Sequence, residues 1–262
     1  MTPGSRQVRG VAAGVGLLLA DNPGPMTLEG TNSYLLAAPG ASSLVVVDPG
    51  PDDQEHLRTL AGEGQVELVL ITHRHPDHTA GAATFAGLTG ASVRAADPAF
   101  CSEGADPLVD GETLAVAGLR IGVLATPGHT DDSMSFHLID DDGPGAVLTG
   151  DTVLGRGTTV IAHPDGNLAS YLDSLGRLAA LGPALVLPAH GPQLPDLAAV
   201  CAAYFEHRQQ RLDSVRAAVL VLGSQASVER VTDLVYTDIE ASVRPAALLS
   251  VAAQLHYLQG LR

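Results

Sequence analysis

Four residues that can bind metal ions stand within a six-residue segment of the chain: His73, His75, Asp77 and His78. The segment directly follows a run of residues 66–71, apolar except for Glu67, which has the length of a buried strand. His73 and His75 alternate along an extended chain, so their imidazoles can point to the same side. A single His-x-His pair could equally belong to a metal site or to a solvated polar loop. Residues elsewhere in the chain have to decide between these two interpretations.

Three later segments repeat the arrangement. In each, a strand rich in Val and Leu ends, and one His or Asp follows with a glycine beside it. Glycine permits the close backbone approach and the unusual dihedral angles that a crowded site needs. The three residues are His129, Asp151 and His190. Nitrogen and carboxylate ligands without a thiolate suit zinc, and such a set can also accept iron or manganese.

The segments around these residues predict two runs of strands, each followed by a helix. Strands are expected over residues 8–19, 33–37, 44–48, 66–71, 92–95, 113–116, 119–125, 134–139, 146–148 and 184–187. Helices are expected over residues 52–61, 77–88, 168–181, 196–222, 228–235 and 244–259. This order suggests an α/β protein with two mixed sheets facing each other and helices outside. The last three helices could form a small satellite domain or a cap.

Composition narrows the function classes. A chain of 262 residues can form one large domain or a domain with a small appendage. A net charge of −15 disfavours general binding of polyanions. Cys101 and Cys201 lie far apart in sequence, which indicates neither a disulfide framework nor a thiolate metal site.

The sequence shows no sign of membrane contact. The apolar runs are too short to span a bilayer, and the first residues do not have the pattern of a signal segment. We therefore expect a cytoplasmic protein.

At these motifs the chain resembles hydrolases of the metallo-β-lactamase superfamily, whose hallmark His-x-His-x-Asp-His stands here at residues 73–78. Over nearly its whole length it most resembles the LACTB2-like branch, which is related to glyoxalase II. The supporting segments are residues 22–25, 30–34, 126–132, 149–159 and 190–192. The resemblance implies a four-layer αββα sandwich over residues 1–194 with the site at one edge. It also implies a small helical, winged-helix-like domain over residues 195–262.

The resemblance further implies two zinc ions, each held by three residues, with one carboxylate between them. The ligands are His73, His75 and His129 for the first ion, Asp77, His78 and His190 for the second, and Asp151 as the bridge. A metal pair about 3.5–4 Å apart can share a water, lower its pKa to about 7 and stabilise charge that develops on the substrate. The nucleophile would then be metal-bound hydroxide, with Asp77 orienting it or accepting its proton.

Three further residues are candidates for supporting roles. Asp48 and Asp132 stand near strand ends and could hold ligand imidazoles in one tautomer. For Asp48 a turn-forming role in Asp-Pro-Gly is an equal alternative. His163 follows a segment expected near the site, and it is either a substrate contact or a surface loop residue.

The substrate is open between two classes of reaction. Main-group zinc β-lactamases have a Cys where Asp151 stands, and flavin-linked di-iron relatives have a Glu where His75 stands, so neither activity is expected. Glyoxalase II shares the ligands, but its basic glutathione-binding residues have no match here. We expect a small ester, thioester or related acyl substrate. The alternative is LACTB2-like endoribonuclease or phosphodiesterase activity on single-stranded RNA, which the net charge disfavours. A non-enzymatic metal-dependent binding protein is a minor third alternative.

Overall fold

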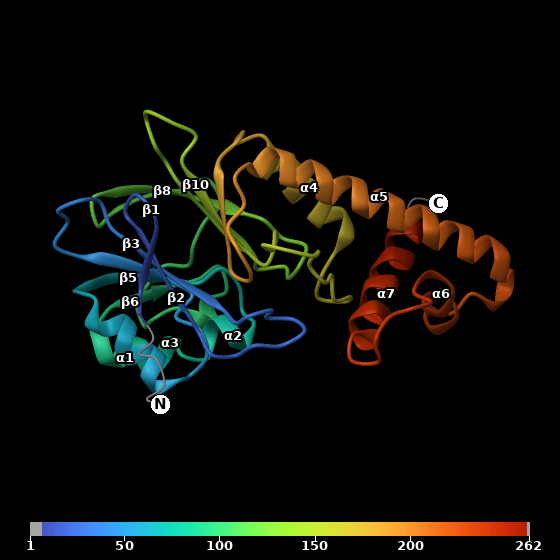
Figure 1. Cartoon of the computed structure of the whole chain (residues 1–262), viewed down its shortest axis with the longest axis horizontal. Helices are drawn as coiled ribbons and strands as arrows, with labels where there is room; N and C mark the ends of the chain where they lie inside the picture. The colour runs from blue at the N-terminus through green and yellow to red at the C-terminus, as the bar shows by residue number, and fades with distance from the viewer. Residues whose placement is uncertain (1–6, 261–262) are drawn as a thin grey trace.

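The computed structural model describes residues 7–260, which form two mixed β-sheets with helices on their outer sides (Figure 1). The first sheet has six strands in chain order, β1 to β6. They are Arg9–Ala12, Val15–Leu19, Asn32–Leu36, Leu44–Val47, Val66–Leu70 and Ser92–Arg94. The second sheet has five strands in the order β11-β10-β9-β8-β7. In chain order, β7 to β11 are Thr113–Val116, Leu119–Ala125, Met134–Leu138, Ala146–Gly150 and Leu185–Pro188.

Helices cover the outer face of each sheet. Helices α1 (Gln54–Gly62) and α3 (Ala82–Thr89) pack on the six-stranded sheet, where Leu57, Leu60 and Phe85 join one buried cluster with its strands. Helix α4 (Leu168–Ala179) and the first half of α5 (Leu197–Leu222) pack on the five-stranded sheet. The layers therefore run helix, sheet, sheet, helix, and the predicted αββα architecture is confirmed.

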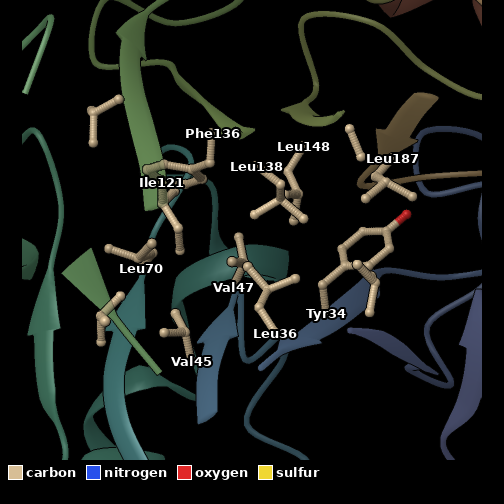
Figure 2. Close-up of a cluster of buried hydrophobic side chains, with 14 of the residues drawn as sticks. Tyr34, Leu36, Val45, Val47, Leu70, Ile121, Phe136, Leu138, Leu148 and Leu187 are labelled. Carbon is tan, nitrogen blue, oxygen red and sulfur yellow. The ribbon is translucent and has the colours of Figure 1, made fainter. Parts of the chain in front are cut away.

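The main core lies between the two sheets, where side chains of both inner faces meet (Figure 2). Successive side chains of a strand point to opposite faces, so Val45 and Val47 of β4 enter this core while Val46 packs towards the helices. Phe136 and Ile121 of the second sheet are fully buried opposite them. A sheet covered on both faces needs apolar residues at every position, which explains the continuous apolar run of β4 and the three apolar residues that end β5.

Two predicted elements were wrong in their extent, and glycines give the reason. Residues 8–19 form a hairpin instead of one strand, because the chain turns at Gly14 with φ +68°. The predicted helix over residues 77–88 is divided into α2 (Pro76–Thr79) and α3. At the division the Gly81 N–H donates to the Gly50 carbonyl, 2.9 Å away, and a Cβ on Gly81 would lie 2.8 Å from the Pro51 carbonyl oxygen.

The C-terminal part consists of α5, α6 (Val228–Val235) and α7 (Arg244–Gly260), as predicted (Figure 1). Within residues 195–260, which the structure describes, there is no strand that could form a wing. Tyr204 and Leu212 of α5 pack in the same cluster as α4, whereas Val215 and Ala218 pack against α6 and α7. The division of the chain at residues 194 and 195 stays a prediction. No helix of the described residues is both long and apolar enough to cross a membrane.

Candidate metal centre

The structure brings all seven predicted ligands together at one edge of the two sheets. The segment of residues 73–78 follows β5 of the first sheet, and the other ligands follow β8, β10 and β11 of the second. Their potential ligand atoms form two groups, and within each group these atoms all lie within 4.8 Å of one another. The groups are His73, His75, His129 and Asp151, and then Asp77, His78 and His190.

In the first group three ring nitrogens face one another. The Nδ1 atom of His75 lies 2.9 Å from Nε2 of His73 and 3.0 Å from Nε2 of His129. The opposite nitrogens of the two partner rings are engaged elsewhere. His129 Nδ1 donates to the Val160 carbonyl oxygen at 2.6 Å, and His73 Nδ1 lies 3.1 Å from the Thr72 hydroxyl.

The Thr72 hydroxyl determines the tautomer of His73. Its single proton is donated to the Asp48 carboxylate, 2.7 Å away, so the hydroxyl accepts from His73 Nδ1–H. The Nε2 atoms of His73 and His129 therefore carry lone pairs, and both face His75. A single Nδ1–H of His75 can be shared between these two lone pairs, whereas a cation among the three nitrogens would satisfy all of them, so this group fits a metal ion.

In the second group, as in the first, ring nitrogens lie close to other atoms that can bind a metal ion. The Asp77 carboxylate lies 3.1 Å from His190 Nε2 and 3.3 Å from His78 Nε2. The Nδ1 atoms of these rings are held on the other side, His78 by Asp48 at 2.8 Å and His190 by the Gly30 carbonyl oxygen at 3.1 Å. In the neutral form of these rings the nitrogens that face Asp77 are acceptors directed at a carboxylate, an arrangement that either a metal ion or a proton on each ring stabilises.

The Asp151 carboxylate lies between the two groups. One oxygen is 3.6 Å from His129 Nε2 and the other is 3.3 Å from His190 Nε2. The second oxygen is buried without a hydrogen-bond partner, as is Nε2 of His78. Buried polar atoms without partners are rare in folded proteins, and these two point at the same space. Asp151 therefore lies where one carboxylate could contact an ion in each group.

Burial and charge act differently on the rings of the two groups. Burial lowers the pKa of His73 well below its usual value, and the neighbouring rings of His78 and His129 lower it further, so this imidazole is neutral. Burial alone would lower the pKa of His78 and of His190, but the carboxylates of Asp48 and Asp151 respectively outweigh it and raise both, so a metal ion at the second group would have to displace protons from these rings.

Burial alone would raise the pKa of Asp77. The nearby imidazoles of His190 and His78, whose Nε2 atoms lie 3.1 and 3.3 Å from the carboxylate, more than offset this effect and lower the pKa, so the carboxylate is ionised.

Asp48 contacts two residues of the metal-centre segment, Thr72 and His78. Its carboxylate accepts from the backbone N–H of Thr72 at 2.8 Å, from the Thr72 hydroxyl and from His78. The residue ends β4 in the left-handed region with φ +51°. The structure thus combines the two interpretations of Asp48, since a strained turn residue carries the carboxylate that orients a ligand ring.

The contacts of the other two candidates lead away from the seven residues. Asp132 lies 3.8 Å from Arg74 Nε, and burial raises the pKa of its carboxyl group. Its described contacts include no ligand imidazole. His163 stacks on His256 of α7, with ring centroids 4.7 Å apart, and lines a crevice beside that helix.

Sequence reasoning missed residues that position the ligand segments. Arg74, between two ligands, forms ion pairs with Asp131 and Asp165 and so ties three loops together. The side-chain amide of Asn32 donates to the carbonyl oxygens of Pro188 and Gly191, both at 2.9 Å, and so fixes the loop that carries His190. The only signal in the sequence was their position within segments that already supported the resemblance.

Comparisons with known proteins agree with this geometry. Residues 26–190 match the family model described as the metallo-beta-lactamase superfamily. The chain is 37% identical over 211 residues to the lactamase-like protein vrtG of Penicillium aethiopicum, a match that covers 76% of this chain and 63% of that protein. The chain thus spans less than two thirds of the length of this fungal relative.

Two further comparisons cover more of both chains. The beta-lactamase-like protein 2 homolog of Caenorhabditis elegans is 33% identical over 257 residues, which is 92% of this chain and 82% of the worm protein. The crystal structure of a beta-lactamase domain protein from Burkholderia ambifaria has a TM-score of 0.80 at 22% identity, and the match covers 99% of this chain and 90% of that one. The chain therefore belongs to the metallo-β-lactamase superfamily of hydrolases and resembles its LACTB2-like branch.

Proposed function

We propose that this protein is a dinuclear metal-dependent hydrolase that acts on a small ester, thioester or related acyl substrate. The observation that carries the proposal is the position of Asp151, whose two carboxylate oxygens face two separate groups of ligand atoms. The donor set is imidazole and carboxylate without thiolate, which makes zinc the first choice and iron or manganese the alternatives.

In this proposal His73, His75 and His129 hold one ion, and Asp77, His78 and His190 hold the other. Two ions bound on either side of Asp151 would lower the pKa of a shared water and stabilise negative charge on a substrate oxygen. The protein itself fixes the ring orientations. For four of the rings an acceptor near Nδ1 directs Nε2 inwards, namely His73, His78, His129 and His190. His75 instead presents Nδ1 to its neighbours.

Asp77 has the further role of a proton acceptor. Its side chain is 26% exposed, whereas that of Asp151 is 11% exposed, so water and substrate reach Asp77 more readily. The oxygen that faces His78 and His190 would hold metal, which leaves the second oxygen of the carboxylate to orient or deprotonate water.

The charge around the site favours an acyl substrate over RNA. The basic residue in the ligand motif, Arg74, is engaged with Asp131 and Asp165 and also lies 4.0 Å from Asp97. It is therefore not free to neutralise a phosphate backbone, and the chain carries a net charge of −15. Cleavage of single-stranded RNA remains the second candidate, because two-metal sites also suit phosphodiester chemistry.

The test compares three substrate classes on the metal-loaded protein: chromogenic esters, chromogenic thioesters and labelled single-stranded RNA, each with and without a chelator. We expect acyl hydrolysis that the chelator abolishes. Asp151→Asn should lower kcat/KM by roughly 1,000-fold, the range for loss of a group that stabilises the transition state. Asp173→Asn, on the exposed side of α4, is the matched control and should retain activity. Cleavage of RNA alone would replace the acyl proposal, and turnover of none of the substrates would overturn the assignment.

A further inference from the structure

A crevice with a volume of about 170 Å³ lies between residues 158–160 and the helices α5 and α7. Helix α5 contributes three basic side chains to it, His207, Arg208 and Arg211, and none of the residues that line it is acidic. This is notable in a chain with 29 Asp and Glu against 14 Lys and Arg. The remaining wall is apolar or carries hydroxyl groups.

Two of the basic residues in the crevice have a side-chain nitrogen without a hydrogen-bond partner. Arg208 is 4% exposed, and although its Nη2 donates to the Thr159 carbonyl oxygen at 2.5 Å, its Nε has no hydrogen-bond partner. Nδ1 of His207 is likewise buried without a partner. In the part of the chain that the structure describes, neither Arg208 nor Arg211 forms an ion pair with a carboxylate. A buried donor without an acceptor is costly, and an external acceptor would relieve that cost.

Aromatic rings hold the two guanidinium groups in position without neutralising them. Arg211 lies over the ring of Tyr236 at 4.9 Å, and Arg208 lies over the ring of Tyr171 at 5.0 Å. A cation–π contact leaves the charge and the N–H groups available, so the groups are preorganised for an anion. The charges of the two arginines also act on His207, because burial and then these two charges lower its pKa.

We propose that this crevice is an oxyanion-binding site for a phosphate or carboxylate group of a small molecule. The guanidinium groups of Arg208 and Arg211 would donate to the anion, and so would the unpartnered Nδ1 of His207. A guanidinium group matches the geometry of both oxyanions. The apolar wall formed by Ile239 and Val243 leaves room for carbon atoms next to the charged group.

The proposed site shares a wall with the metal centre. Thr159, whose carbonyl oxygen accepts from Arg208, also has its hydroxyl 3.2 Å from Nδ1 of His129. The next residue, Val160, accepts from the same nitrogen. An anion in the crevice is therefore either the charged end of the substrate or a separate ligand that acts on the same segment. The binding site itself does not depend on the proposed hydrolysis.

Inorganic phosphate is the probe for the first experiment, titrated by calorimetry into the metal-loaded full chain. The variants are Arg211→Gln and His207→Gln, and Arg216→Gln is the matched control, because it removes the same charge from the exposed side of the same helix. Phosphate bound at the metal ions is common to all four proteins, so the difference isolates the crevice.

We expect Arg216→Gln to match the wild type and both crevice variants to lose at least about ten-fold in phosphate affinity. Thermal melts show whether each variant is folded, and His207→Gln tests the site if Arg211→Gln is not. Identical titrations for all folded proteins would overturn the proposal.

A second arm compares two thioesters that differ only in a terminal phosphate. A rise in KM for the phosphorylated thioester alone in Arg211→Gln would assign the anion to the substrate. Lost phosphate binding with both KM values unchanged would assign the site to a free anion. Either result supports the binding site. If all the proteins are inactive on both thioesters but the wild type still binds phosphate in the crevice, the result counts against the hydrolase proposal. The proposal of an anion-binding site would still stand.

Discussion

At the scale of single residues, each inward-facing nitrogen depends on what its ring contacts on the opposite side. His78 is the clearest case, because its Nδ1 lies 2.8 Å from a buried carboxylate that also receives two hydrogen bonds from Thr72. Removing the charge of that carboxylate would leave the ring in place but make it a weaker ligand.

Asp48→Asn should therefore weaken metal retention by about 10–100-fold, the range found when a group that orients a ligand is lost. The measurement is competition for metal with a chromophoric chelator. Asp52→Asn changes an exposed carboxylate nearby and should leave the affinity unchanged. Equal affinities in both variants would mean that Asp48 serves the turn and not the metal centre.

The two cysteines should differ in reactivity. Burial raises the pKa of Cys201 to about 12, so its thiol is protonated at pH 8 and is a poor nucleophile. Cys101 is partly exposed. With iodoacetamide at pH 8, mass spectrometry should show one label on the folded protein and two after denaturation. Rapid double labelling of the folded chain would contradict the burial of Cys201 in the cluster with α4.

The sequence predicted which His and Asp residues lie together, because residue type itself carries that information. His and Asp after strand ends were identified without knowing what lay opposite them. It predicted supporting contacts less well, because these depend on distant segments. Asp132 lies beside Arg74 and His163 stacks on α7, and neither of these distant partners could be inferred from local sequence.

At the scale of elements, the loop after β8 depends on its close approach to α4. Gly128 has φ +141°, and a Cβ at this position would lie 2.4 Å from Cα and Cβ of Tyr171. The next residue is the ligand His129, so a change at Gly128 acts on both stability and the metal centre.

Gly128→Ala should lower the free energy of unfolding by roughly 2–5 kcal/mol, from overpacking and from strain at positive φ. It should also weaken metal binding. The control is Gly176→Ala in the exposed face of α4, where a Cβ meets nothing within 4 Å. That variant should be more stable by about 0.5–1 kcal/mol. Urea unfolding curves measure both, and an unchanged midpoint for Gly128→Ala would refute the packing argument.

A surface ion pair also links these elements. The Asp110 carboxylate accepts from Arg177 of α4 at 2.7 and 3.0 Å and from the backbone N–H of Ala125 at 2.8 Å. Burial alone would raise the pKa of Asp110, but the hydrogen bonds with Arg177 and Ala125 and the charge of Arg177 together outweigh burial and lower it. A lowered pKa in the folded state stabilises the fold above the ordinary pKa, and this contribution is lost as the pH falls through the folded value.

Asp110→Asn should therefore be less stable than the wild type at pH 7, by a fraction of about 1 kcal/mol because the pair is exposed. The difference should shrink as the pH falls below the ordinary Asp pKa of 3.8. Unfolding curves at pH 7 and near pH 3 test this, and a difference that grows on acidification would reverse the sign of the argument.

Apolar periodicity predicted whether a segment is a helix or a strand, and most of the predicted strands and helices are present in the structure. The errors lie where backbone contacts override the periodicity. The hairpin at Gly14 and the break at Gly81 are set by approach to Ala37 and to the Gly50–Pro51 turn, which are remote in sequence. A pattern within one segment cannot show that a neighbouring backbone leaves no room for a continuous element.

At the scale of the whole molecule, the proposed metal centre joins the two sheets at their shared edge. One ligand segment leaves the first sheet and three leave the second. The backbone reinforces this connection, since Asn32 of β3 donates to the Ala189 carbonyl oxygen, 2.7 Å away, next to His190. The topology therefore explains why ligands that are 117 positions apart, such as His73 and His190, meet in one site.

Anomalous diffraction at the zinc edge, on crystals of the zinc-loaded protein, tests the central claim most directly. The account predicts two peaks about 3.5–4 Å apart, one beside His73, His75 and His129 and one beside Asp77, His78 and His190, with Asp151 between them. A single peak, or peaks away from these side chains, would contradict a dinuclear centre.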